Sequence, residues 1–204
     1  RLNEEHMTFC MTHSLLGEMG IPSACEYDIP ACLSIAILST LADAPAYMGN
    51  TTHDAKAIAT GRYGLSPFFH TDINDKCLDV VKADPDNIVL TWHAVPRRNM
   101  RGWDAPKAPY AIRPFAASGF GVTFRYDFTR DAGTTITMCR ISPDCSKLFV
   151  AKGEIVGGVG YQDYSCSEGV FFRVKDGNDF FQKQLEVGNH VPLVYGDCFD
   201  QVCA

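Results

Sequence analysis

Two carboxylates, Glu26 and Asp28, lie just before a long apolar run without charge, residues 31–42. We expect this run to form a helix that is buried on most sides. Both acids would then lie near the helix N-terminus, where the dipole favours negative charge. A carboxylate held there stays ionised, as a metal ligand or a general base requires.

Helix capping is the alternative explanation for the same residues. Asp28 is a common N-cap residue, and Pro30 suits the first turn of a helix. Glutamate is a poor N-cap, so capping explains Asp28 better than it explains Glu26. Cys25 adjoins Glu26, but nothing else in the sequence indicates a thiolate site. The sequence alone leaves both roles open for Asp28.

Two histidines lie where strands are expected to begin or end. His93 comes late in residues 87–95, an apolar segment that we predict to be a strand. His190 follows a Gly-Asn pair and opens a second apolar segment, 190–196. A histidine in an apolar strand is commonly a hydrogen-bonded core residue, whereas a histidine at a helix-to-strand junction is well placed as a ligand. Neither histidine identifies a site by itself.

The composition is that of a globular protein. The 204 residues are 46% hydrophobic and 21% charged, and the formal net charge is −6. Arg97, Arg98 and Arg101 form only a small basic cluster, so nucleic-acid binding is disfavoured. No apolar stretch has transmembrane length and no signal peptide is recognisable, so we expect no membrane association.

The cysteines are scattered through the chain, and no two of them have C-x-x-C spacing. A structural zinc site or a disulfide framework would require tighter pairing. We therefore interpret them as reduced thiols of a cytoplasmic protein. The nine are Cys10, Cys25, Cys32, Cys77, Cys139, Cys145, Cys166, Cys198 and Cys203.

The chain divides into two halves near residue 118. The first half predicts helices over 4–19 and 30–42, a strand over 45–48 that ends in a Gly49-Asn50 turn, a polar connection over 50–87 and the strand 87–95. This order is typical of an α/β fold.

The second half predicts short alternating strands separated by polar turns, which indicate an antiparallel sheet or small barrel. We expect Gly157-Gly158 to be one of the turns. A short helix, 178–187, precedes the last strand.

Five segments in this order resemble the C-terminal part of the L-fucose isomerase and L-arabinose isomerase superfamily. The resemblance runs from residue 9 nearly to the end of the chain. Its most specific segments are residues 24–28 (ACEYD), 46–50 (AYMGN), 89–93 (VLTWH), 149–156 (FVAKGEIV) and 188–197 (GNHVPLVYGD).

The resemblance implies an aldose–ketose isomerase that uses a divalent metal, usually Mn²⁺, and acts on a monosaccharide. The family's metal-binding glutamate falls on Glu26 and its ligand histidine on His190. Its second carboxylate ligand falls on or beside Asn50, where the fucose enzymes have an aspartate. Glu26 and Asn50 are then the catalytic positions, the metal ligands are Glu26, Asn50 and His190, and Asp28 and His93 are accessory groups. His93 is near the position of a further metal-binding histidine in the arabinose branch.

The resemblance also implies the fold. Residues 1–117 would be an α/β catalytic segment, the end of a three-layer α/β domain. Residues 118–204 would be an antiparallel β-barrel with a short helix. The family's chains are much longer, and their upstream domains shape part of the sugar site and build a homo-oligomer. We therefore expect this segment alone to be inactive or very weak.

The leading functional hypothesis is isomerisation through an ene-diol, in which a carboxylate moves the proton and a metal stabilises negative charge. The first alternative is a non-catalytic sugar-binding or assembly protein that retains the fold. The second is a domain with no ligand. The leading hypothesis requires Glu26, Asn50 and His190 to converge in the folded chain.

Overall fold

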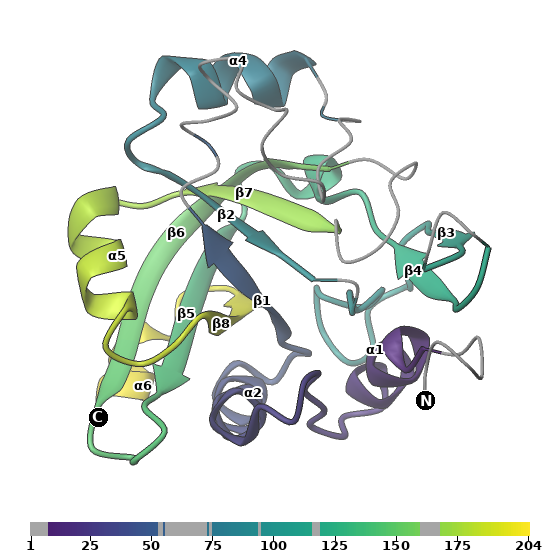
Figure 1. Cartoon of the computed structure of the whole chain (residues 1–204), viewed down its shortest axis with the longest axis horizontal. Helices are drawn as coiled ribbons and strands as arrows, with labels where there is room; N and C mark the ends of the chain where they lie inside the picture. The colour runs from purple at the N-terminus through teal and green to yellow at the C-terminus, as the bar shows by residue number, and fades with distance from the viewer. Residues whose placement is uncertain are drawn as a thin grey trace.

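The computed structural model describes residues 8–52, 55, 73, 75–93, 95–115, 119–159 and 168–204. It has a mixed α/β fold around a six-stranded antiparallel sheet (Figure 1). The strand order β1-β2-β7-β6-β5-β8 closes on itself, because β8 also pairs with β1. The strands are β1 (Tyr47–Thr52), β2 (Ile88–Trp92), β5 (Thr135–Ile141), β6 (Leu148–Gly158), β7 (Gly169–Arg173) and β8 (His190–Tyr195).

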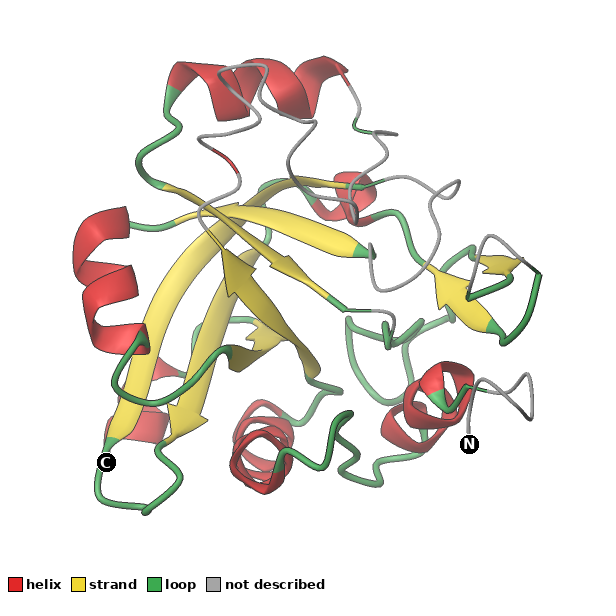
Figure 2. Ribbon diagram, viewed as in Figure 1, coloured by secondary structure: helices red, strands yellow, loops and turns green. Residues whose placement is uncertain are grey.

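Helices surround this sheet, and a small two-stranded sheet lies beside it (Figure 2). The helices are α1 (Cys10–Glu18), α2 (Ile29–Ala42), α4 (Asp75–Ala83), α5 (Gly177–Gln184), α6 (Phe199–Cys203) and the 3-10 helix η2 (Phe128–Asp131). The small sheet pairs β3 (Ala111–Arg113) with β4 (Thr123–Arg125). In the described part of the chain, none of the helices has the length and apolarity needed to cross a membrane.

Helix α2 confirms the helix that the apolar run predicts, but not its burial on most sides, because one face is buried and the opposite face carries exposed apolar residues. Asp28 is its N-cap and accepts a hydrogen bond from the Ala31 backbone N–H at 2.9 Å, and Pro30 lies in the first turn. Ala31, Ile35 and Leu38 are buried where the helix packs against β5 and β8. The capping interpretation of Asp28 is therefore correct, and it fixes where α2 begins relative to the sheet.

The predicted boundary at residues 117 and 118 does not separate two sheets. Strands β1 and β2 come from the first half, yet β1 pairs with β8 and β2 pairs with β7, both from the second half. The closed strand order therefore needs both halves, and residues 118–204 supply only four of its six strands.

Two predicted turns are wrong. Gly49-Asn50 lies inside β1, because this segment is hydrogen-bonded to a neighbouring strand on each side. Gly157-Gly158 ends β6 beyond a register shift in its pairing with β7. A Cβ on Gly49 would lie 2.6 Å from Thr91 Cγ2, so close approach of β1 and β2 requires a glycine at this position.

Helix α1 is joined by ionic and backbone contacts to the segment that follows β2. Glu18 accepts hydrogen bonds from Arg98 Nε and Nη2 at 2.6 Å each, and Lys107 Nζ lies 3.1 Å from its second oxygen. The neighbouring Arg97 is fully buried and donates to the backbone carbonyls of Val95 and Ser23. Because residues 95–98 come two to five positions after His93, this anchoring also restrains the end of β2.

The Glu18–Arg98 pair predicts a pH-dependent contribution to stability. Burial alone would raise the pKa of Glu18, but the hydrogen bonds from Arg98 outweigh it and the pKa is lowered. The stabilisation is thus fully present above the unfolded pKa of about 4.3 and is lost as pH falls through the folded pKa. We expect Glu18→Gln to lower the free energy of unfolding by about 3 kcal/mol at pH 7.

Urea unfolding of the unmodified protein and of Glu18→Gln, at pH 7 and at pH 3, measures the difference in their free energies of unfolding. This difference should be smaller at pH 3. Glu186→Gln is the matched control, since Glu186 forms an exposed pair with Lys147 and its loss should hardly move the midpoint. An equal loss at both pH values would show that the ionised pair does not stabilise the fold.

Candidate functional site

Glu26 lies between two histidines that come from distant parts of the chain. Its Oε1 is 3.6 Å from His93 Nε2, and its Oε2 is 3.6 Å from His190 Nε2. The two imidazole rings meet edge to face, with centroids 5.4 Å apart. Both separations from Glu26 are too long for hydrogen bonds. The structure therefore brings together three of the residues that the sequence identified.

Each separation is close to that of two ligand atoms on one metal ion, although the two histidines face different oxygens of Glu26. Among the described residues, the group of potential ligand atoms that all lie within 4.8 Å of one another comprises Cys25, Glu26 and His93, and His190 lies outside it. Two ligand atoms at about 2.1 Å from an ion, at a tetrahedral angle, lie about 3.4 Å apart. Neither Nε2 atom has a hydrogen-bond partner among the described residues, although both are buried. Because an unpaired buried polar atom costs free energy, a ligand between these rings and Glu26 would satisfy both nitrogens.

The backbone of His93 is held at the end of β2. Its N–H donates to the Glu168 carbonyl at 2.8 Å and lies 2.7 Å from the Tyr47 hydroxyl. The same hydroxyl donates to the His93 carbonyl at 2.9 Å. The His93 side chain is fully buried, and neither of its ring nitrogens is hydrogen-bonded within the described residues. A core histidine is normally hydrogen-bonded, so core packing alone does not explain His93.

His190 is oriented by the helix cap. Its Nδ1 lies 2.8 Å from Asp28 Oδ2, which also accepts a hydrogen bond from Arg140 Nη1 at 2.9 Å. Arg140 also donates to the carbonyls of Val187 and His190, at 2.8 and 2.6 Å. An ionised Asp28 can only accept, so His190 Nδ1 carries the proton of that bond. In the neutral ring, the lone pair is then on Nε2, which faces Glu26.

The pKa shifts favour the protonation states that a metal ligand needs. Burial tends to raise the pKa of Asp28, but hydrogen bonds from Arg140, Ala31 and His190 outweigh it and the pKa is lowered. The adjacent His93 ring lowers the pKa of Glu26. Burial lowers the pKa of His93, and Glu26 opposes that shift only in part. Near neutral pH the site therefore holds two carboxylates and a neutral His93.

The backbone at Glu26 is strained. Glu26 and Tyr27 have φ values of 58° and 55°, in the left-handed region that costs non-glycine residues roughly 1–2 kcal/mol each. Tyr27 is fully exposed, so packing of its side chain does not offset this cost. The Glu26 side chain is 59% exposed. The strained turn thus directs a solvent-accessible carboxylate at two buried imidazoles, and such strain is concentrated at functional sites.

Asn50 lies beside this cluster on β1. It is directly opposite His190 in the β1–β8 ladder, and directly opposite residues have side chains on the same face of a sheet. Its side-chain Oδ1 accepts a hydrogen bond from Asn189 Nδ2. Asn50 is thus a neighbour of His190, and its role as a ligand or catalytic residue stays a prediction.

Two residues of the site were not identified from the sequence. Arg140, the penultimate residue of β5, is 112 positions from Asp28 and has no local signal. Cys25 did have a local signal, because it is adjacent to Glu26 in the sequence. Its Sγ, a Glu26 carboxylate oxygen and a His93 ring nitrogen all lie within 4.8 Å of one another. Burial raises the pKa of the Cys25 thiol to about 11, so without a metal it is protonated and a poor nucleophile.

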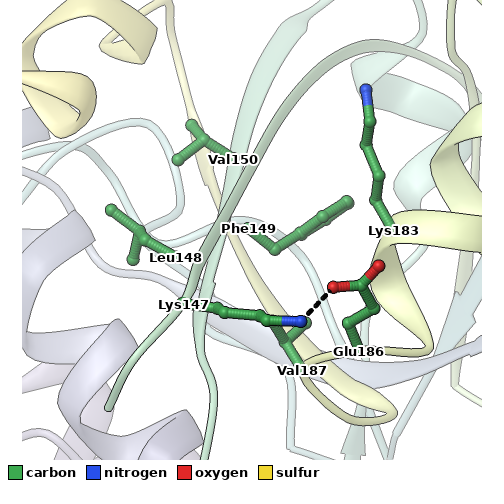
Figure 3. Close-up of a pocket in the computed structure, with 7 residues that line it drawn as sticks. All are labelled: Lys147, Leu148, Phe149, Val150, Lys183, Glu186 and Val187. Atoms are coloured by element: carbon green, nitrogen blue, oxygen red, sulfur yellow. Dashed lines mark hydrogen bonds and ion pairs between the residues drawn. The ribbon is translucent and has the colours of Figure 1, made fainter.

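A separate pocket of about 370 Å³ lies between β6 and α5 (Figure 3). Lys147 and Glu186 form an ion pair across it, and Lys183, which also lines it, pairs with Asp179. These side chains are more than half exposed. Since the charges are paired at the surface, this pocket lacks the buried convergent polar groups found around Glu26.

Comparison with known proteins gives no match: no protein-family model fits this sequence, and no curated protein or solved structure is significantly similar to it.

The hydrogen bond between Asp28 and His190 predicts how metal binding depends on the cap. Asparagine caps helices as well as aspartate does, so Asp28→Asn should retain α2. It removes the charged partner of His190, and loss of such partners weakens metal binding by about 10–100-fold. Calorimetric titration with Mn²⁺ and Zn²⁺, alongside circular dichroism, measures both effects.

Asp43→Asn is the matched control, because Asp43 is at the other end of α2 in a left-handed conformation that asparagine also tolerates. It should leave metal affinity unchanged. Unaltered affinity in Asp28→Asn would contradict the orienting role of Asp28.

Proposed function

We propose that the chain is the catalytic segment of a metal-dependent aldose–ketose isomerase of the L-fucose and L-arabinose isomerase type. The single observation that carries this proposal is that Glu26 lies beside His190, the two positions on which the family's metal-binding glutamate and ligand histidine fall, and beside the accessory His93, which is near a further metal-binding histidine of the arabinose branch. The substrate would be an open-chain monosaccharide, and the metal a divalent ion such as Mn²⁺. The full-length protein would be a cytoplasmic homo-oligomer with the three-layer α/β domain and β-barrel of that family.

The protein residues divide the chemistry between them. The metal, when bound, polarises the sugar carbonyl and stabilises negative charge on the ene-diol. Glu26, which is ionised and exposed, takes the proton from C2 of the aldose and returns it to C1, while the hydroxyl proton moves from O2 to O1. His93 and His190 act as neutral ligands, and Asp28 stays ionised to orient His190.

One observation favours the alternative of a sugar-binding or assembly protein without turnover. Asn50 stands where the fucose enzymes carry a second carboxylate ligand. Its amide cannot move a proton near neutral pH, and its oxygen is engaged by Asn189. A protein that binds a metal and a sugar but does not isomerise the sugar would fit this alternative.

Turnover of sugars separates the two functions. We expect the full-length protein, loaded with a divalent metal, to convert L-fucose, L-arabinose or a related aldose to its ketose. Glu26→Gln should lower kcat by at least about a hundredfold, the usual contribution of a general acid–base group. Ketose formation measured by chromatography gives the rates.

Glu186→Gln, an exposed glutamate on another surface, is the control and should retain full activity. Metal and sugar binding without ketose formation would establish the non-catalytic alternative. Full activity in Glu26→Gln would contradict the assignment of Glu26.

A further inference from the structure

We propose that Cys25 is a fourth ligand of this metal site, and that the site selects Zn²⁺ or Co²⁺ over Mn²⁺. The proposal rests on the metal site of the proposed function and adds the chemical class of the ion. It assigns a thiolate to a site that otherwise offers only oxygen and nitrogen ligands.

The geometry of the turn carries the first part of the argument. The sulfur of Cys25 lies within 4.8 Å of both the Glu26 and His93 ligand atoms. Ligand atoms in a tetrahedral zinc site lie about 3.4–3.7 Å apart, so a small contraction would complete the coordination. The Asp28 N–H donates to the Cys25 carbonyl at 3.2 Å, and this bond closes the turn that places Cys25 beside the start of α2.

His93 is an independent second observation. Its ring is fully buried, and neither nitrogen has a hydrogen-bond partner within the described residues. Its Nε2 faces the carboxylate of Glu26 at 3.6 Å. A buried imidazole that points at potential ligands, and that no described residue hydrogen-bonds, indicates that an ion completes its surroundings.

The ligand types decide which ion this is. Cys25, Glu26 and His93 offer one sulfur, one carboxylate and one imidazole within 4.8 Å of one another, and His190 adds a second imidazole beside the other oxygen of Glu26. Sulfur and imidazole suit zinc-like ions, whereas Mn²⁺ prefers carboxylate, carbonyl and water oxygens. Formation of the sulfur–metal bond breaks the S–H bond of Cys25 and releases its proton to solvent, so no oxidant or reductant is needed.

Optical titration with Co²⁺ in reducing buffer tests the proposal on the full-length protein. The Co²⁺ complex of the unmodified protein should show near-ultraviolet thiolate-to-cobalt charge-transfer absorption. Cys25→Ser should abolish that absorption and weaken Zn²⁺ and Co²⁺ binding by about tenfold or more, while Mn²⁺ affinity changes by less than about threefold. Cys32→Ser, on α2, is the matched control and should change neither the spectrum nor the affinities.

The outcomes separate this proposal from the proposed function. Co²⁺ binding that depends on Glu26 but gives no charge-transfer absorption would overturn the role of Cys25 and leave the site intact. The absence of any Glu26-dependent binding of Co²⁺, Zn²⁺ or Mn²⁺ would overturn both. Because the first spectrum is recorded on the unmodified protein, misfolding of the Cys25→Ser variant would not remove the test.

Discussion

The carboxylate of Asp28 makes contacts that the rest of the site depends on. It caps α2 through the Ala31 N–H, accepts from Arg140 of β5 and bonds the ring of His190 at the start of β8. Because the group must be ionised to serve all three partners, Arg140 is needed to balance its charge. The start of α2, the register of two strands and the direction of one imidazole are therefore joined in one hydrogen-bond network.

The closed strand order explains why the two histidines meet. Strand β1 pairs with β2 on one side and with β8 on the other, so the backbones next to His93 and His190 lie two strand spacings, or about 9.6 Å, apart. Side chains that turn toward each other cover that distance, and their ring centroids are 5.4 Å apart. The turn before α2 then places Glu26 against both rings. No two of these three residues are close in the sequence, so the fold alone creates the site.

Local chemistry made α2 predictable. An uncharged apolar run, a good N-cap at Asp28 and Pro30 in the first turn all indicate the same helix start. Alternating residues likewise identified β5, β6 and β7, and the apolar segment 190–196 identified β8. The prediction of Asp28 as an N-cap is correct. Glu26 and His190 also lie together in the folded chain, as the sequence analysis expects.

The errors arise where tertiary contacts override local preference. Gly49-Asn50 has the composition of a turn, but β1 has strands on both sides, and the small size of Gly49 serves close packing against Thr91. Arg140 could not be assigned, because a charged residue in a strand usually faces solvent, whereas this side chain is buried against α2 and β8. Pairing between distant strands is not visible in any local pattern.

Anomalous X-ray diffraction at the zinc edge, from crystals of the full-length protein grown with Zn²⁺, tests the central claim most directly. The account predicts one strong peak about 2.0–2.2 Å from a Glu26 carboxylate oxygen and from Nε2 of both His93 and His190. A peak bound elsewhere, with Glu26 turned to solvent and the two imidazoles still unligated, would contradict it.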